Sequence, residues 1–130
     1  MNVAMTIAGS DPSGGAGLQA DLKTFHQHGV YGTSVVTLLT VQNTRTVESV
    51  EVLAPELIVS QLDAVLADIP PAAAKTGALG SAAVIEAIAE RAERFSFPLV
   101  VDPVMVSKHG VSLIDDAAAD VLASKLLPSA

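Results

Sequence analysis

The stretch from Ile7 to Asp21, IAGSDPSGGAGLQAD, decides the fold. Its apolar beginning predicts a short buried strand, and its end predicts the start of a helix. Gly14, Gly15 and Gly17 lie between them and predict a tight turn, because glycine adopts positive φ and lets the backbone approach a bound group closely. We expect the amides of this turn to point into a site and, with the positive end of the helix dipole, to favour an anion or an electron-rich oxygen. The alternative is an ordinary connection between strand and helix.

Outward from this turn, apolar runs typical of strands alternate with helical spacings. The predicted strands are Val3–Ala8, Ser34–Val41, an edge strand at Val47–Leu53, a weaker candidate at Ala72–Thr76, and Leu99–Val101. The predicted helices run from Leu18 to Gly29, from Pro55 to Pro70, from Ser81 to Phe95, and from about Asp115 to Pro128. This alternation predicts an α/β domain in which right-handed crossovers join a mostly parallel sheet with helices on both faces.

Length and composition narrow the class of protein. The chain has 130 residues, of which 50% are hydrophobic, and this fits one modest domain with its own core. Only 3% are aromatic, so the core is expected to be aliphatic. A net charge of -7 argues against nucleic acid and against an anionic membrane surface as partners. A small molecule is the expected partner.

Several kinds of chemistry have no support in the sequence. The chain has no cysteine, and so no disulfide framework or thiolate nucleophile. His26, His28 and His109 lack the spacing of metal ligands, and no serine lies in a nucleophile-elbow context. Neither a signal peptide nor a long apolar span is evident, which favours a cytoplasmic location.

Polar residues follow the apolar strands at their carboxyl ends. These are Gly9 to Asp11, Gln42 with Asn43, Lys75 to Gly77, and Asp102. An open parallel sheet binds ligands at the carboxyl ends of its strands. We therefore expect these residues to gather at one rim and form a single site.

Four motifs together resemble one known family. They are the glycine-rich turn, QNT at 42–44, KTG at 75–77, and VVDPVM at 100–105 followed by SKHG. In their order and spacing they resemble the hydroxymethylpyrimidine and phosphomethylpyrimidine kinases of thiamine biosynthesis. These belong to the ribokinase-like superfamily, in which pyridoxal kinases are their nearest relatives. The resemblance extends from Val3 to Pro128 and implies the three-layer, Rossmann-like fold of that superfamily.

The resemblance also implies how the chain relates to a whole kinase. A family member continues for about as many residues again beyond the matching part. Residues 1–130 are therefore expected to form the N-terminal, substrate-binding half of a single ribokinase-like domain, apparently truncated. The glycine-rich anion hole, the catalytic residue and most of the nucleotide site are expected in the C-terminal half. We accordingly expect residues 1–130 alone to be inactive.

The activity implied by the resemblance is ATP-dependent phosphorylation of 4-amino-5-hydroxymethyl-2-methylpyrimidine and of its monophosphate, with ATP as donor and Mg²⁺ as metal. The alternatives are pyridoxal kinase-like activity and a non-catalytic fragment that binds a pyrimidine or a complementary half. A dinucleotide-binding domain fits less well, because the second strand ends in Gln42 rather than in an acidic residue. An exposed edge at Leu99–Val101 would favour self-association, so a homo-oligomer, such as a dimer, or pairing with a complementary half is expected.

Five residues are candidates for binding the substrate. The amide of Gln42 can pair in a bidentate way with an amino group and a ring nitrogen, and it resembles the pyrimidine-reading glutamine of the family. Asp21 borders the apolar face of its helix and needs a partner, because an unpaired buried charge is expensive. By resemblance, Asp21 and the backbone amide of Gly9 contact the substrate and Val104 lines its pocket. Ala78 stands where many relatives carry methionine, which implies a roomier pocket.

The phosphate side of the site has weaker candidates. Asp102 precedes a proline at the end of a strand, and its carboxylate suits a Mg²⁺ ion near phosphates. Lys75 and Lys108 are further candidates, for neutralising phosphate oxygens.

Overall fold

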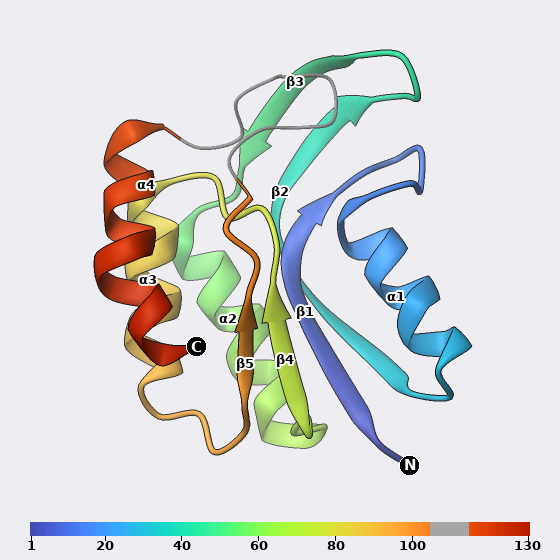
Figure 1. Cartoon of the computed structure of the whole chain (residues 1–130), viewed down its shortest axis with the longest axis vertical. Helices are drawn as coiled ribbons and strands as arrows, with labels where there is room; N and C mark the ends of the chain where they lie inside the picture. The colour runs from blue at the N-terminus through green and yellow to red at the C-terminus, as the bar shows by residue number, and fades with distance from the viewer. Residues whose placement is uncertain (105–114) are drawn as a thin grey trace.

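The computed structural model describes residues 1–104 and 115–130 (Figure 1). The described strands are β1 (Val3–Ser10), β2 (Tyr31–Gln42), β3 (Val47–Val52), β4 (Ala73–Thr76) and β5 (Leu99–Val101). The described α-helices are α1 (Gly17–Gln27), α2 (Pro55–Asp68), α3 (Ala82–Ala92) and α4 (Asp116–Val121). A π-helical turn at Leu122–Leu126 and a 3₁₀ turn at Leu127–Ser129 continue α4 to the end of the chain.

The strands form one sheet in the order β3-β2-β1-β4-β5. β1 pairs in parallel with β2 on one side and with β4 on the other, and β5 continues the sheet in parallel with β4. β3 pairs antiparallel with β2 and forms the edge that the sequence predicts. The chain therefore reverses its direction of winding at β1, and the carboxyl ends of β1 and β4 flank the point where open α/β sheets bind ligands.

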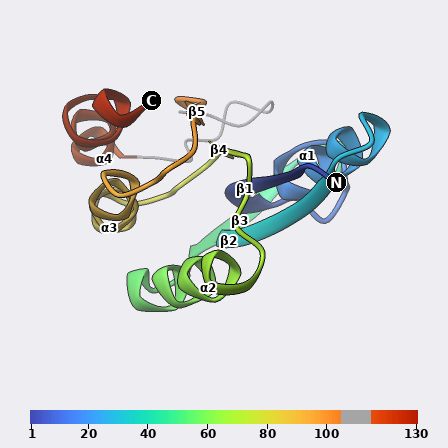
Figure 2. The same ribbon diagram turned by 90° about the horizontal axis from the view of Figure 1, so that it is seen from below.

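Helices lie on both faces of the sheet, which confirms the predicted α/β fold (Figure 2). α1 joins β1 to β2 and lies on one face, where it contacts both strands. α2 and α3 lie on the opposite face, and α4 packs against α3. This arrangement follows from right-handed crossovers, which place connecting helices on opposite faces when the winding direction reverses.

Local signals in the sequence account for the beginnings of the helices. Pro55 opens α2, where its missing amide costs nothing. The side chain of Ser81 accepts a hydrogen bond from the amide of Val84 at the start of α3, and Asp115 caps α4 through the amide of Ala118. α1 begins after Ala16 without a side-chain cap.

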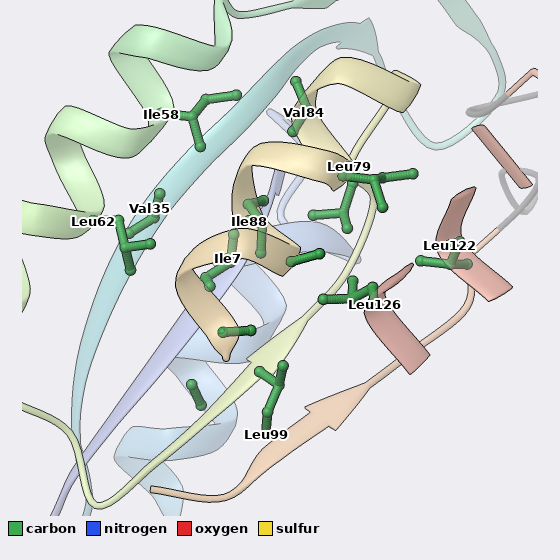
Figure 3. Close-up of a cluster of buried hydrophobic side chains, with 14 of the residues drawn as sticks. Ile7, Val35, Ile58, Leu62, Leu79, Val84, Ile88, Leu99, Leu122 and Leu126 are labelled. Atoms are coloured by element: carbon green, nitrogen blue, oxygen red, sulfur yellow. The ribbon is translucent and has the colours of Figure 1, made fainter. Parts of the chain in front are cut away.

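The core is aliphatic, as the composition predicts, and lies between the sheet and the layer of α2, α3 and α4 (Figure 3). Its side chains come from both the strands and the helices and include Ile7, Val35, Ile58, Leu62, Ile88 and Leu126. On the other face, α1 has no fully buried residue. Its predicted inner stripe of Leu18, Leu22 and Phe25 is only half-buried.

Most element boundaries differ from the prediction by a few residues, and two of these differences are informative. β2 begins at Tyr31 rather than Ser34, because pairing with β1 continues through Gly32 and Thr33. The last helix changes to π-helical hydrogen bonding at Leu122, which spacing alone does not reveal. In the described part of the chain, no helix is both long and apolar enough to cross a membrane.

Candidate substrate site

A cavity of about 270 Å³ lies at the carboxyl ends of β1, β2, β4 and β5. It receives residues from the turn after β1, from α1 and from the ends of the other three strands. The predicted site residues Gly9, Asp21, Gln42, Ala78, Asp102 and Val104 all line it. Segments far apart in the sequence thus converge on one cavity. Its volume is at the small end for a ligand pocket and suits a single substituted ring.

The turn after β1 is held by the carboxylate of Asp11, which is 1% exposed. One carboxylate oxygen accepts hydrogen bonds from the amide and the hydroxyl of Ser13, at 2.8 and 2.6 Å. The other accepts from the amides of Gly15 and Ala16, at 3.1 and 2.8 Å. Asp11 therefore satisfies the amides that precede α1 and places a negative charge at the positive end of that helix.

These bonds correct one expectation for the turn. The amides of Ser13, Gly15 and Ala16 were expected to point toward a ligand, and instead they donate to Asp11. The amide of Gly14 donates to the carbonyl of Asp11, at 3.0 Å. The physical reason is that a buried carboxylate within the turn competes for the same donors as an external anion and is always present. The turn forms one wall of the cavity through Asp11, Ala16 and Gly17. The anion that its amides bind is the carboxylate of Asp11.

Gly17 is the position where this turn requires glycine. Its φ is +60°, and a Cβ at this position would lie 2.5 Å from the carbonyl oxygen of Gly9. No side chain can be accommodated at that distance. The close approach of Gly17 to Gly9 places the start of α1 directly against the end of β1, beside the cavity.

Asp21 has two partners within the site. Its Oδ2 accepts a 2.6 Å hydrogen bond from the hydroxyl of Thr6 and a 2.9 Å bond from the ammonium of Lys75. The Lys75 and Asp21 side chains are 23% and 21% exposed. Asp21 thus borders the apolar face of α1, as its spacing predicts, and it has the partner that a half-buried carboxylate needs. The ammonium group of Lys75 forms an ion pair with Asp21. The role of Lys75 in neutralising phosphate oxygens stays a prediction.

Gln42, the last residue of β2, is linked to a neighbour two positions earlier on the same face. Its Nε2 donates to the hydroxyl of Thr40 at 2.7 Å, and that hydroxyl donates to the carbonyl of Ser10 at 2.8 Å. All three residues line the cavity. This arrangement leaves the carbonyl oxygen of the Gln42 amide and one of its N–H groups for a ligand.

Other predicted residues line the cavity with their backbone or with small side chains. Ala78 is half-buried, and its carbonyl accepts a 2.6 Å hydrogen bond from the buried hydroxyl of Thr37. Gly9 is buried, and a Cβ there would overlap Leu38, which forms another part of the lining. Val104 is half-buried after β5. The roles of these residues toward a substrate stay predictions.

Asp102 lies at the exposed rim of the cavity, where its amide donates to the carbonyl of Thr76 at 3.3 Å. In residues 1–104 and 115–130, no group of three or more histidine or carboxylate side chains is placed to hold a metal. A lone carboxylate is compatible with Mg²⁺, which binds through one or two carboxylates together with waters and substrate phosphates. Lys108 and His109, with the SKHG motif and Met105, lie outside the described residues.

Some lining residues were not singled out from the sequence. They are Leu38, Thr40, Ala16 and Ala20. For Thr40 a signal was available, because residues two apart on a strand share a face and Gln42 was already a candidate. Ala16 and Ala20 could not be predicted in this way, because an alanine contributes to a cavity only by having a small side chain.

The comparisons with known proteins agree with this geometry. The profile of the family described as phosphomethylpyrimidine kinase matches residues 11–130. A curated relative from Synechococcus elongatus, named hydroxymethylpyrimidine/phosphomethylpyrimidine kinase, is 52% identical over 128 residues, which are 98% of this chain and 49% of that relative. The chain therefore spans about half the length of the curated relatives that it matches.

Solved structures give the same result. The crystal structure of phosphomethylpyrimidine kinase from Clostridium difficile superposes with a TM-score of 0.93 at 48% identity, covering 100% of this chain and 57% of that one. The pyridoxal kinase from Staphylococcus aureus in complex with pyridoxal superposes with a TM-score of 0.87 at 37% identity, covering 100% and 48%. The fold is thus the ribokinase-like one, and the greater identity lies with the pyrimidine kinases. With a profile match over most of its length, the chain belongs to the phosphomethylpyrimidine kinase family.

Proposed function

We propose that the protein phosphorylates 4-amino-5-hydroxymethyl-2-methylpyrimidine, and then its monophosphate, with ATP as donor. The observation that carries the proposal is the amide of Gln42, which lines a cavity of about 270 Å³ and retains one acceptor and one donor for a ligand. An aminopyrimidine offers the complementary pair, an amino N–H and a ring nitrogen. Family membership supplies the reaction type, phosphoryl transfer to a hydroxyl group.

The other lining residues support this substrate. The proposed roles are that Asp21 and the amide of Gly9 hydrogen-bond the substrate, while Val104 and Ala78 pack against its ring. The side chain of Asp21 has Thr6 and Lys75 on its Oδ2, so its other oxygen is suited to accept from the substrate hydroxymethyl group. A hydroxyl fixed in this way can be aligned with a phosphoryl donor, and such alignment is most of what catalysis of phosphoryl transfer requires.

ATP and Mg²⁺ are the proposed cofactors. Solved pyridoxal kinases of the same fold are described in complex with ADP or AMP-PCP, which supports an adenine nucleotide as donor. Asp102 would hold Mg²⁺ at the rim of the cavity, and the metal would there neutralise charge on the transferred phosphoryl group. The catalytic residue is proposed to lie outside residues 1–130, which form the substrate-binding part of one kinase domain and are inactive alone.

Association and location are part of the proposal. In the described residues, β5 pairs with β4 alone and is the last strand of the sheet, and Val100 on its face is 64% exposed. An exposed strand edge invites pairing with another segment. We propose either a homodimer or assembly with a complementary half, in the cytoplasm.

Pyridoxal phosphorylation is the second candidate, and Ala78 is the observation that favours it. A methyl side chain leaves more of the cavity free beside the ring than methionine does in many relatives. The likeness to the Staphylococcus aureus pyridoxal kinase is compatible with this candidate. Pyridoxal phosphorylation ranks second because this chain is 37% identical to that pyridoxal kinase and 48% identical to the phosphomethylpyrimidine kinase from Clostridium difficile.

The test is a coupled ADP-release assay on the complete expressed protein with ATP and Mg²⁺, comparing the aminopyrimidine with pyridoxal. We expect kcat/KM to be higher for the aminopyrimidine, and a Gln42→Leu variant to lose roughly 100-fold, since a bidentate pair contributes about 1–3 kcal/mol. A higher kcat/KM for pyridoxal would support the second candidate. Turnover of neither substrate would refute both.

The same assay on residues 1–130 alone tests the division of the domain. Binding of the aminopyrimidine in calorimetry without ADP release is the expected result. Turnover at ordinary enzyme rates by this polypeptide would refute the proposal that the catalytic residue lies elsewhere.

A further inference from the structure

Thr40 lies next to Gln42 on the cavity side of β2, and none of the roles proposed above uses it. From its hydrogen bonds we infer that Thr40 is a positioning residue that sets specificity by fixing which end of the Gln42 amide faces which side of the cavity. The inference rests on the proposed function, in which Gln42 reads the edge of a pyrimidine.

The Thr40 hydroxyl has a single proton, and the carbonyl of Ser10 takes it. Thr40 Oγ1 donates to the carbonyl oxygen of Ser10 at 2.8 Å. A hydroxyl has one proton, so Oγ1 has only lone pairs left for Gln42. Gln42 Nε2 donates to those lone pairs at 2.7 Å. The hydrogen bonds therefore run in one direction, from Gln42 to Thr40 to Ser10.

The opposite orientation of the Gln42 amide is unfavourable. If the Gln42 amide rotated by half a turn, its Oε1 would face Thr40 Oγ1 at about the same distance, with no proton between them. Two acceptors in that position repel, and the half-buried setting of both residues strengthens the effect. Reversing Thr40 to donate to Gln42 would remove a donor from the carbonyl of Ser10. The orientation with Nε2 toward Thr40 is thus held by a partner on another strand.

The pairing of β1 with β2 is irregular directly before Thr40. The pairing of β1 with β2 is Ala8 with Val36 and then Ser10 with Leu39, so β2 carries one extra residue at this point. Such a bulge re-aims the side chains that follow it. Thr40 and Gln42, which follow the bulge, both line the cavity, whereas Leu39 and Val41, the residues before Thr40 and before Gln42, are exposed.

The consequence is a preference among heterocycles of the same shape. With Nε2 fixed on the Thr40 side, the amide presents its free N–H and Oε1 in one order. An aminopyrimidine edge presents a ring nitrogen acceptor and an amino donor, and it pairs with that order. The 4-oxo analogue presents a ring N–H donor and a carbonyl acceptor at the same positions, and it needs the amide rotated. Thr40 is therefore predicted to reject the oxo analogue without touching it.

The experiment compares Thr40→Val, which keeps the shape and removes the hydroxyl, with Thr40→Ser, which keeps the hydroxyl. Calorimetry on the complete protein measures the ratio of Kd for 4-amino-5-hydroxymethyl-2-methylpyrimidine and for its 4-oxo analogue. We expect the wild-type preference for the amino compound to fall by about tenfold or more in Thr40→Val and to persist in Thr40→Ser, in keeping with the discrimination of bidentate pairs. Equal weakening of both ligands by Thr40→Val, with the ratio unchanged, would reduce Thr40 to a structural role and overturn the inference.

A measurement without ligand separates this inference from the proposed function. In nuclear magnetic resonance spectra, the side-chain amide protons of Gln42 should exchange with water more slowly in wild type and Thr40→Ser than in Thr40→Val. Identical exchange in the three proteins would overturn the positioning role even if the aminopyrimidine binds. A wild-type protein that binds neither heterocycle would refute the proposed function and, with it, the specificity assigned to Thr40.

Discussion

Lys75 on β4 and Asp21 on α1 form a 2.9 Å ion pair, although 54 residues separate them in the sequence. The pair links the face of the sheet to the helix that borders the cavity, and both residues belong to its lining. Each side chain is about one-fifth exposed, so solvent screens the pair only in part.

Replacing one partner should therefore cost more than breaking a surface pair. In Lys75→Met, Asp21 would retain its bond from Thr6 but lose the compensating charge. We expect the free energy of unfolding to fall by about 1–2 kcal/mol, between the values for exposed and buried pairs. Urea denaturation measures this change.

A double-mutant cycle with Asp21→Asn supplies the control. The double variant should be more stable than the sum of the two single effects implies, because removing both charges leaves neither uncompensated. Strict additivity would mean that the ion pair contributes nothing to stability.

Asp11 is expected to make the largest side-chain hydrogen-bonding contribution to the stability of its turn. Asp11→Ala removes the acceptor for four donors, namely the amides of Ser13, Gly15 and Ala16 and the Ser13 hydroxyl. We expect a loss of about 2–4 kcal/mol in unfolding free energy, with much faster hydrogen exchange at the amides of Gly15 and Ala16.

Ser13→Ala is the matched control, since it removes only the hydroxyl bond and leaves the three amide bonds to Asp11. Its expected cost is below about 1 kcal/mol. Equal effects of the two variants would show that the carboxylate does not organise the turn.

Much of this architecture could be predicted from local signals. Short apolar runs identified every strand of residues 1–104 and 115–130, and the rule that parallel sheets bind ligands at their carboxyl ends located the cavity. The same rule predicted that Gln42, Lys75 and Asp102 meet at one cavity, because each lies at the carboxyl end of a strand or directly after it.

Contacts that depend on tertiary structure could not be predicted in this way. The direction of the turn amides depends on where the Asp11 carboxylate points, and many glycine-rich turns have the same composition. The side chain of Gln61 on α2 bonds both the amide and the carbonyl of Val36 on β2, each at 2.9 Å. A glutamine on a helix gives no local sign that it will pair with the backbone of a strand 25 residues earlier.

Gly17 and Gly29 offer a test that separates steric overlap from backbone strain. Both have positive φ, +60° and +69°, but a Cβ at Gly17 would lie 2.5 Å from the Gly9 carbonyl oxygen, whereas at Gly29 nothing lies within 4 Å. We expect Gly29→Ala to cost about 1–2 kcal/mol, the value for alanine in the left-handed region. Gly17→Ala should cost substantially more and also weaken binding at the adjacent cavity.

Thermal unfolding measures the stability of Gly17→Ala and Gly29→Ala, and calorimetry measures their affinity for the aminopyrimidine. Similar stability and similar affinity in Gly17→Ala and Gly29→Ala would contradict the close approach between Gly17 and Gly9.

Thr76 and Thr37 are two fully buried threonines with opposite hydrogen-bonding situations. Both are 0% exposed, but the Thr76 hydroxyl has no partner in the described part of the chain, whereas the Thr37 hydroxyl donates to the Ala78 carbonyl at 2.6 Å. Valine has nearly the same shape as threonine and lacks the polar atom. Thr76→Val should therefore raise the unfolding free energy by about 1 kcal/mol, since an unsatisfied buried hydroxyl is unfavourable.

Thr37→Val should have the opposite sign. It leaves the carbonyl of Ala78 without its donor, at an expected cost of about 1–3 kcal/mol. Because Ala78 lines the cavity, this variant should also weaken binding of the aminopyrimidine, whereas Thr76→Val should leave the affinity within about twofold, a difference of less than 0.5 kcal/mol. Denaturant unfolding and calorimetry on the two variants decide the matter, and the same sign of stability change in both would mean that the two hydroxyls do not differ in their partners.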